Sequence, residues 1–129
     1  MLSRKVLVAE DNEGVRSAFG YILSDCRYNI VLVCNGREAW ELLDRGEKFD
    51  IVISDYAMPE MNGIKLLQEI RADARVADIP FILMSEERVI SNEDRTPLEE
   101  VCDKNSAVFL KKPFSVGELI ALLEDAGSS

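Results

Sequence analysis

Five short runs of apolar, mostly aliphatic residues recur along the chain, and none of them alternates with polar positions. Such uninterrupted runs are typical of strands that are buried on both faces of a parallel sheet. We therefore expect five central parallel strands, at residues 6–9, 30–33, 51–54, 81–84 and 108–110.

Longer stretches with apolar residues at helical spacing separate these runs. Phe19 and Ile22 have this spacing in the first stretch, and the turn at Asn35 and Gly36 leads into the second. Helices are expected at residues 15–23, 38–43, 64–70 and 116–123. Because right-handed crossovers cover both faces of a parallel sheet, the alternation predicts a doubly wound α/β fold with a five-stranded parallel sheet.

The fourth connection departs from this pattern. Residues 86–105 are polar and acidic, and their apolar stripe is limited to Leu98, Val101 and Cys102. The segment 96–99, Thr-Pro-Leu-Glu, has the form of a capping box with proline at the first helical position, which predicts a short helix there. Residues 86–95 would then form a long loop, followed by an atypical fourth helix.

Composition limits the class of protein. The 129 residues suit one domain, which we expect to span residues 1–129, and 47% hydrophobic with 30% charged residues indicates a packed core. The formal net charge of −9 repels a phosphate backbone, so direct nucleic-acid binding is not expected. The N-terminal segment is neither a signal peptide nor a spanning helix, which predicts a cytoplasmic protein without membrane insertion.

The absence of histidine and the small number of cysteines limit the kinds of catalytic and metal site that the chain can form. The chain has no histidine, which excludes Ser-His-Asp catalysis, histidine metal ligands and a phosphohistidine carrier. Its three cysteines form no CxxC pair, so neither a disulfide framework nor a zinc site is indicated. Any chemistry must rest on carboxylates, hydroxyls and lysines.

Such residues follow four of the five predicted strands. In open parallel sheets, ligands bind beyond the carboxyl ends of the strands, where the strand order reverses. The residues at these ends are Glu10 and Asp11, Asp55, Ser85, and Lys111 and Lys112. If the strand order is the flavodoxin-like 2-1-3-4-5, the first and third strands are neighbours and the three acids converge.

Three neighbouring carboxylates repel one another, and a hard cation such as Mg²⁺ would compensate that repulsion. An aspartate carboxylate can attack phosphorus to form an acyl phosphate, while the metal and a lysine neutralise the developing charge. These residue types therefore predict a Mg²⁺-dependent phosphoryl-transfer site.

Four blocks of sequence carry a resemblance to a known family. They are KVLVAEDN at 5–12, IVISDYAMPEMNG at 51–63, IPFILMS at 79–85 and FLKKPF at 109–114. In this order and at strand ends, they resemble the receiver domains of two-component response regulators, including the chemotaxis regulators. The resemblance runs nearly end to end.

The resemblance implies a role for each acidic residue. Asp55 would be the phosphoacceptor and Asp11 a direct metal ligand. Glu10 would act on the metal through a water, and the backbone carbonyl of Ala57 would complete the protein ligands of Mg²⁺.

The remaining motif residues would serve charge balance and switching. Lys112, directly before Pro113, matches the family's lysine, and the family's Lys-Pro bond is typically cis. Ser85 matches the switch hydroxyl and Phe109 the aromatic that changes rotamer with it. The implied partners are a histidine kinase or histidine phosphotransfer protein as phosphodonor and a downstream effector protein. The domain would assist its own phosphorylation without being a turnover enzyme.

Two positions depart from the family pattern. Glu86 stands where the family prefers a small residue, and its charge would oppose an incoming phosphoryl dianion. Ala57 has no polar side chain to orient water, which predicts a changed phosphoryl lifetime.

Other readings compete with the phosphorelay receiver. Glu10, Asp11 and Asn12 can also act merely as caps of the first helix. A receiver fold without phosphorylation would be a protein-interaction module that binds through residues 86–105. An aspartate-nucleophile phosphatase usually has a second aspartate where this chain has Ala57, and a nucleotide switch would need a GxxxxGK[ST] loop, which is absent.

Overall fold

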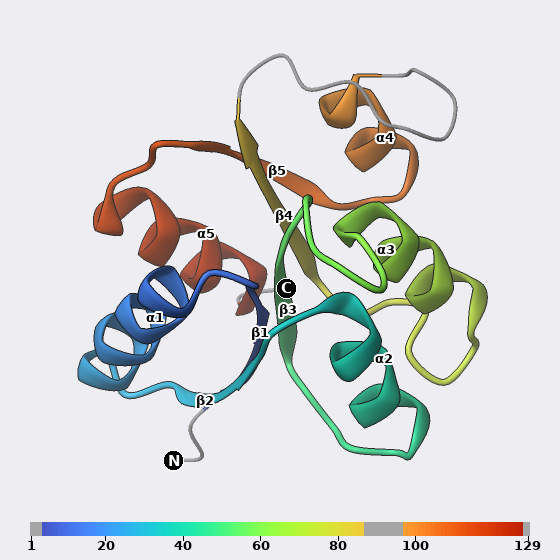
Figure 1. Ribbon diagram of the computed structural model, residues 1–129, viewed down its shortest axis with the longest axis horizontal. Coiled ribbons are helices and arrows are strands. Elements are labelled where there is room, and N and C mark those ends of the chain that lie inside the picture. The colour runs from blue at the N-terminus through green and yellow to red at the C-terminus, as the bar shows by residue number, and fades with distance from the viewer. Residues whose placement is uncertain (1–3, 87–96, 128–129) are drawn as a thin grey trace.

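The computed structural model of the protein describes residues 4–86 and 97–127. Strands and helices alternate throughout this part of the chain (Figure 1). The strands are β1 (Lys5–Ala9), β2 (Asn29–Val33), β3 (Ile51–Asp55), β4 (Phe81–Glu86) and β5 (Val108–Lys112). The helices are α1 (Glu13–Asp25), α2 (Gly36–Asp44), α3 (Gly63–Ala72), α4 (Leu98–Lys104) and α5 (Val116–Gly127).

The strands form one parallel sheet in the order β2-β1-β3-β4-β5. This order confirms the predicted doubly wound fold. The order reverses between β1 and β3, which are hydrogen-bonded neighbours with Ala9 opposite Ser54. The residues that follow β1 and end β3 therefore leave the sheet side by side.

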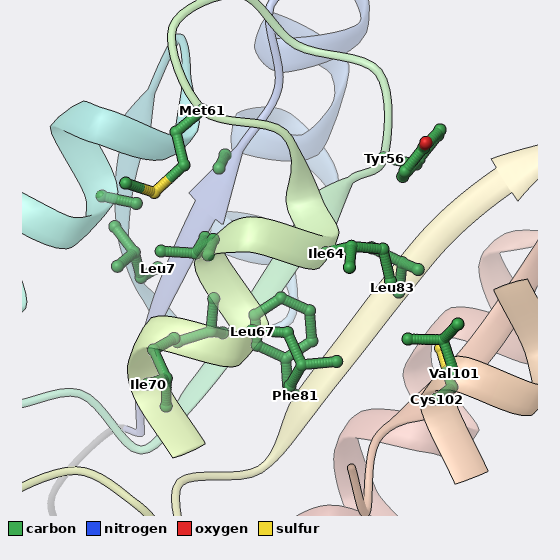
Figure 2. Packing of buried hydrophobic residues seen from close by; sticks show 14 of the residues in the cluster. Leu7, Tyr56, Met61, Ile64, Leu67, Ile70, Phe81, Leu83, Val101 and Cys102 are labelled. Atoms are coloured by element: carbon green, nitrogen blue, oxygen red, sulfur yellow. The ribbon is translucent and has the colours of Figure 1, made fainter. Parts of the chain in front are cut away.

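Two hydrophobic layers enclose the sheet. Helices α1 and α5 cover one face, where Phe19, Leu23, Leu119 and Leu123 pack against inward-facing strand residues (Figure 1). Helices α2, α3 and α4 cover the other face. Figure 2 shows this second layer, in which apolar side chains of α3 such as Leu67 pack with Leu7 and Phe81 of the sheet.

The edge strands correct one expectation from the sequence. We expected all five strands to be central, yet within the described residues β2 and β5 each pair with one strand only. Their apolar side chains are partly exposed as a result, with Leu32 37% and Val108 43% accessible to solvent. Uninterrupted apolar runs did not distinguish edge from centre because an edge strand also contributes apolar residues to both core layers, as β2 does with Val31 on one side and Ile30 on the other.

Helix α4 is present, but its start differs from the expectation. It begins at Leu98, and Pro97 is the N-cap without a side-chain hydrogen bond to the helix. Pro97, which was predicted to be the first helical residue, therefore stands one position before the helix. The predicted capping residue Thr96 and the predicted loop at 86–95, apart from Glu86, lie outside the described residues.

Arg71 anchors the end of α4 at the edge of the sheet opposite the strand carboxyl ends. Its guanidinium donates to the carbonyl oxygens of Asn105 at 2.7 Å and Ser106 at 3.2 Å, which follow α4. It also donates to Ala77 at 3.0 Å and Ile79 at 2.7 Å, in the connection before β4. One side chain therefore joins α3 to two other connections.

Cys102 is expected to resist thiol reagents in the native protein. Cys102 is buried on the inner side of α4, and this burial is the main cause that raises its pKa to about 12, whereas the thiolate is the reactive form. The exposed Cys26 should therefore be labelled first at neutral pH, and Cys102 only after denaturant is added. Mass spectrometry of labelled peptides checks this order, with Cys26→Ser removing the first labelled site. Rapid native labelling of Cys102 would contradict the packing of α4.

Among the described residues, no helix has the length and apolar character needed to cross a membrane.

Candidate functional site

The candidate site lies at the carboxyl edge of the sheet, where β1 and β3 end. Ligand-capable oxygens of Glu10, Asp11 and Asp55 all lie within 4.8 Å of one another. Glu10 and Asp55 are buried, with 1% and 8% of their surface exposed, whereas Asp11 is open to solvent. The structure thus brings together the three acids that the sequence predicted would converge.

Lys112 forms ion pairs with two of these acids. Its Nζ lies 2.9 Å from Asp55 Oδ1 and 3.6 Å from Glu10 Oε1. Burial lowers the pKa of Lys112, but the hydrogen bond to Asp55 and the charges of Asp55 and Glu10 outweigh it, so the pKa is raised overall. The ammonium form is therefore retained beside the carboxylates. The bond between Lys112 and Pro113 is cis, as the family resemblance implied.

Only one of the two carboxylate oxygens of Glu10 accepts a hydrogen bond from the described residues. Its Oε2 accepts from the backbone N–H of Asn12 at 3.1 Å, whereas its buried Oε1 has no hydrogen-bond partner. Burial and the neighbouring charge of Asp55 raise the pKa of Glu10 against the opposing effects of the Asn12 bond and Lys112. This buried oxygen accepts no hydrogen bond from the described residues, although Lys112 Nζ lies 3.6 Å away, and its place beside two further carboxylates fits a hard cation such as Mg²⁺.

The backbone around Asp55 is held by close packing. The N–H of Gly63 donates to the Tyr56 carbonyl at 2.9 Å, and the Ser54 hydroxyl donates to the Asp55 carbonyl at 2.9 Å. A Cβ atom at Gly63 would overlap the Asp55 carbonyl oxygen and a methyl group of Leu83. The close approach of Gly63 to β3 had no sequence signal.

The other predicted site residues, Ser85, Ala57 and Phe109, differ in their exposure and in their neighbours. Ser85 is buried one residue beyond Met84, which lies opposite Asp55 in the sheet register. Ala57 is exposed and lines the same depression as Asp11. Phe109 is half-buried and packs on the core cluster beneath α3 and α4. Its side chain therefore belongs to the layer beneath these helices rather than to the carboxylate cluster.

Glu86 stands at the rim of the site. It is exposed as the last residue of β4, opposite Lys112 in the sheet register. The two side chains line a cleft of about 610 Å³ together with apolar residues of α1 and of the segment after β5, which are Val15, Phe19, Pro113 and Phe114. The expected extra negative charge is thus positioned beside the site lysine.

Helix capping accounts for the position of Asn12 but not for the direction of the Glu10 side chain. Asn12 is the N-cap of α1, and its side chain accepts from the N–H of Val15 at 2.9 Å. Glu10 instead turns toward Lys112. Arg16 was not among the predicted site residues, but its guanidinium donates to the carbonyl oxygens of Glu10 at 2.9 Å and Asp11 at 3.4 Å. An arginine one turn into a helix has no distinguishing sequence pattern.

Similarity to known proteins agrees with this geometry. Residues 6–124 match the response regulator receiver domain family. The two-component response regulator ORR5 of Oryza sativa subsp. japonica is 32% identical over 117 residues, which is 91% of this chain and 84% of that protein. The 3',5'-cyclic-nucleotide phosphodiesterase regA of Dictyostelium discoideum is 40% identical over 82 residues, or 63% of this chain, but the match spans only 10% of its length.

Solved structures share the fold. The chemotaxis response regulator CheY4 of Vibrio cholerae superposes with a TM-score of 0.82 at 26% identity, covering 97% of this chain and 99% of that one. The receiver domain of a sensor histidine kinase from Pseudomonas aeruginosa, solved with a magnesium ion in its active-site cleft, gives 0.80 at 26% identity over 98% and 100%. The chain therefore belongs to the response-regulator receiver family of two-component signalling.

Proposed function

We propose that this domain is a phosphorelay switch in which Asp55 accepts a phosphoryl group from the phosphohistidine of a histidine kinase or histidine phosphotransfer protein. The observation that carries this proposal is the contact of Lys112 Nζ with Asp55 Oδ1 at 2.9 Å inside a cluster of three carboxylates. A buried nucleophilic carboxylate paired with a lysine suits transfer of a dianionic group.

The chain's own residues account for most of the transfer step. A carboxylate oxygen of Asp55 forms a bond to phosphorus while the phosphorus–nitrogen bond of the donor breaks, and the imidazole keeps that electron pair and takes a proton from solvent. Lys112 moves from the Asp55 carboxylate to an oxygen of the arriving group, where its charge offsets the new negative charge. Ser85 donates a hydrogen bond to another oxygen.

The carboxylate cluster also fits a divalent cation. Asp11, Asp55 and the Ala57 carbonyl would hold Mg²⁺ directly, and Glu10 would hold it through a water. When bound, this ion would neutralise charge on the phosphoryl oxygens during transfer. The buried Oε1 of Glu10 supports this assignment because it accepts no hydrogen bond from the described protein residues.

Phosphorylation would be read through a change at the surface near α4. Ser85 ends the buried part of β4, and Phe109 packs beneath α4 together with Leu98 and Val101. Movement of the Ser85 hydroxyl toward a phosphoryl group would change the packing beside Phe109 and so shift a two-state surface. A downstream effector protein would bind one of the two states, and the domain would not act as a turnover enzyme.

Asp55→Asn is expected to abolish phosphorylation. Wild-type protein incubated with acetyl phosphate and Mg²⁺ should gain the mass of one phosphoryl group, because the amide of asparagine cannot replace the carboxylate as nucleophile. Intact-mass spectrometry measures the gain. Asp25→Asn, at the exposed end of α1, is the matched control and should gain the same mass as wild type.

The opposite result would favour a different function. If the wild-type protein gains no mass from acetyl phosphate, phosphoramidate or a phosphorylated histidine phosphotransfer protein, the phosphorelay proposal is wrong. The domain would then be a protein-interaction module that retains the receiver fold. A Mg²⁺ titration followed by amide NMR of residues 10–12 and 55–57 would show whether its acidic site still binds the ion.

A further inference from the structure

Arg16 bridges α1 and the backbone of the acidic segment. Its half-buried side chain reaches back from the first turn of α1, and Nη1 donates to the carbonyl oxygens of Glu10 and Asp11 at 2.9 and 3.4 Å. Its backbone N–H donates to the Asn12 carbonyl at 2.9 Å, which is the first bond of the helix. One residue therefore contacts three successive carbonyl groups that precede the helix.

These contacts begin where the backbone hydrogen bonds between β1 and β2 end. The N–H of Glu10 donates to the Val33 carbonyl at 3.0 Å, continuing the pairing of β1 with β2 by one residue. Beyond this bond the backbone turns toward α1, and the directions of the Glu10 and Asp11 side chains follow from the orientation of these two peptide groups. The Arg16 guanidinium binds both carbonyls and so sets that orientation.

We propose that Arg16 is a positioning residue for the Mg²⁺ site, which it serves by orienting the peptide groups of Glu10 and Asp11 without contacting the ion. This proposal rests on the proposed function, because it concerns the same carboxylates. Groups that orient metal ligands through hydrogen bonds commonly matter for metal affinity, and their loss typically lowers it by about 10- to 100-fold. Arg16 holds the backbone of these ligands in the same way.

Charge and geometry predict opposite effects of Arg16 on Mg²⁺. A nearby positive charge repels the ion, so removing it would tighten Mg²⁺ binding if charge were all that mattered. Loss of the two carbonyl contacts would instead let the acidic side chains spread over more orientations and weaken binding. The sign of the change therefore separates the two explanations.

Arg16→Ala is expected to weaken Mg²⁺ binding about tenfold, at the lower end of the effects seen for groups that orient metal ligands. Arg16→Lys, which keeps the charge and one donor group, should recover part of this loss. Calorimetric titration of the unphosphorylated protein with Mg²⁺ measures the affinity, and denaturant unfolding in the same buffer shows that each variant is folded.

Arg71→Ala is the matched control. Arg71 also donates to backbone carbonyls, but at the opposite edge of the sheet, so its loss should lower stability and leave Mg²⁺ affinity unchanged. Equal Mg²⁺ affinity of Arg16→Ala and wild type, or tighter binding by the variant, would overturn the inference while the phosphorelay proposal stands. Absence of Mg²⁺ binding and of phosphorylation by the wild type would instead refute the proposed function.

A second measurement needs no metal. In Mg²⁺-free protein, amide hydrogen exchange at Asn12 reports on its bond to Glu10 Oε2, which depends on the orientation of the same segment. Exchange at Asn12 should be faster in Arg16→Ala than in wild type, and near the wild-type rate in Arg71→Ala. Unchanged exchange in a folded Arg16→Ala would also overturn the inference. Arg16→Lys serves the same comparison if the alanine variant does not fold.

Discussion

Lys112→Met is expected to slow phosphorylation of Asp55 by about a hundredfold to a thousandfold, the usual effect of removing one group that stabilises developing charge. The ammonium group of Lys112 lies 2.9 Å from Asp55 Oδ1, and methionine keeps a similar chain length without the charge. Mg²⁺ binding should become tighter because a repelling charge is removed. The rate of mass gain with acetyl phosphate at saturating Mg²⁺ measures the effect.

The neighbouring lysine offers a matched control for this variant. Lys111 is exposed and lies opposite Ser85 in the sheet register, so Lys111→Met changes the net charge equally without removing the contact to Asp55. It should phosphorylate at nearly the wild-type rate. Equal rates for Lys112→Met and Lys111→Met would show that Lys112 does not assist the transfer.

Gly63→Ala is expected to destabilise the protein by about 3 kcal/mol, the upper part of the usual range for overpacking in a core. The added methyl group would overlap the Asp55 carbonyl oxygen and the Leu83 side chain, and the backbone beneath it is not a flexible side-chain end that can move aside. The midpoint of denaturant unfolding should fall accordingly.

Gly117→Ala tests whether this loss comes from packing. Gly117 lies in the first turn of α5, and an added Cβ there would meet only the Ser115 hydroxyl oxygen at an ordinary 3.7 Å. Alanine favours a helix over glycine by about 0.5–1 kcal/mol, so this variant should be slightly more stable than wild type. A Gly63→Ala protein as stable as Gly117→Ala would contradict the close approach of α3 to β3.

Local patterns predicted the elements of this fold well. The apolar runs of β1, β3 and β4 are buried on both faces, so hydrophobicity alone located them. The same patterns did not identify β2 and β5 as edges, because edge strands also contribute apolar residues to the two core layers. At α4 the polar surroundings left the start of the helix one residue off the prediction.

The residue types of the site and their places at strand ends could be read from the sequence alone. Carboxylates after two apolar runs and a lysine before Pro113 restrict the chemistry, since charge and nucleophilicity belong to the side chain itself. The resemblance to receiver domains added roles for Ser85, Ala57 and Phe109, which stay predictions.

Only the tertiary structure decided how these groups meet. Parallel pairing of β1 with β3 brings Glu10 beside Asp55, although about 45 residues separate them in the sequence. The packing of α1 places Arg16 on the carbonyls of the acidic segment, and that of α3 leaves room for no side chain at residue 63. Such distances follow from strand order and helix packing, which depend on contacts between remote segments and leave no local pattern in the chain.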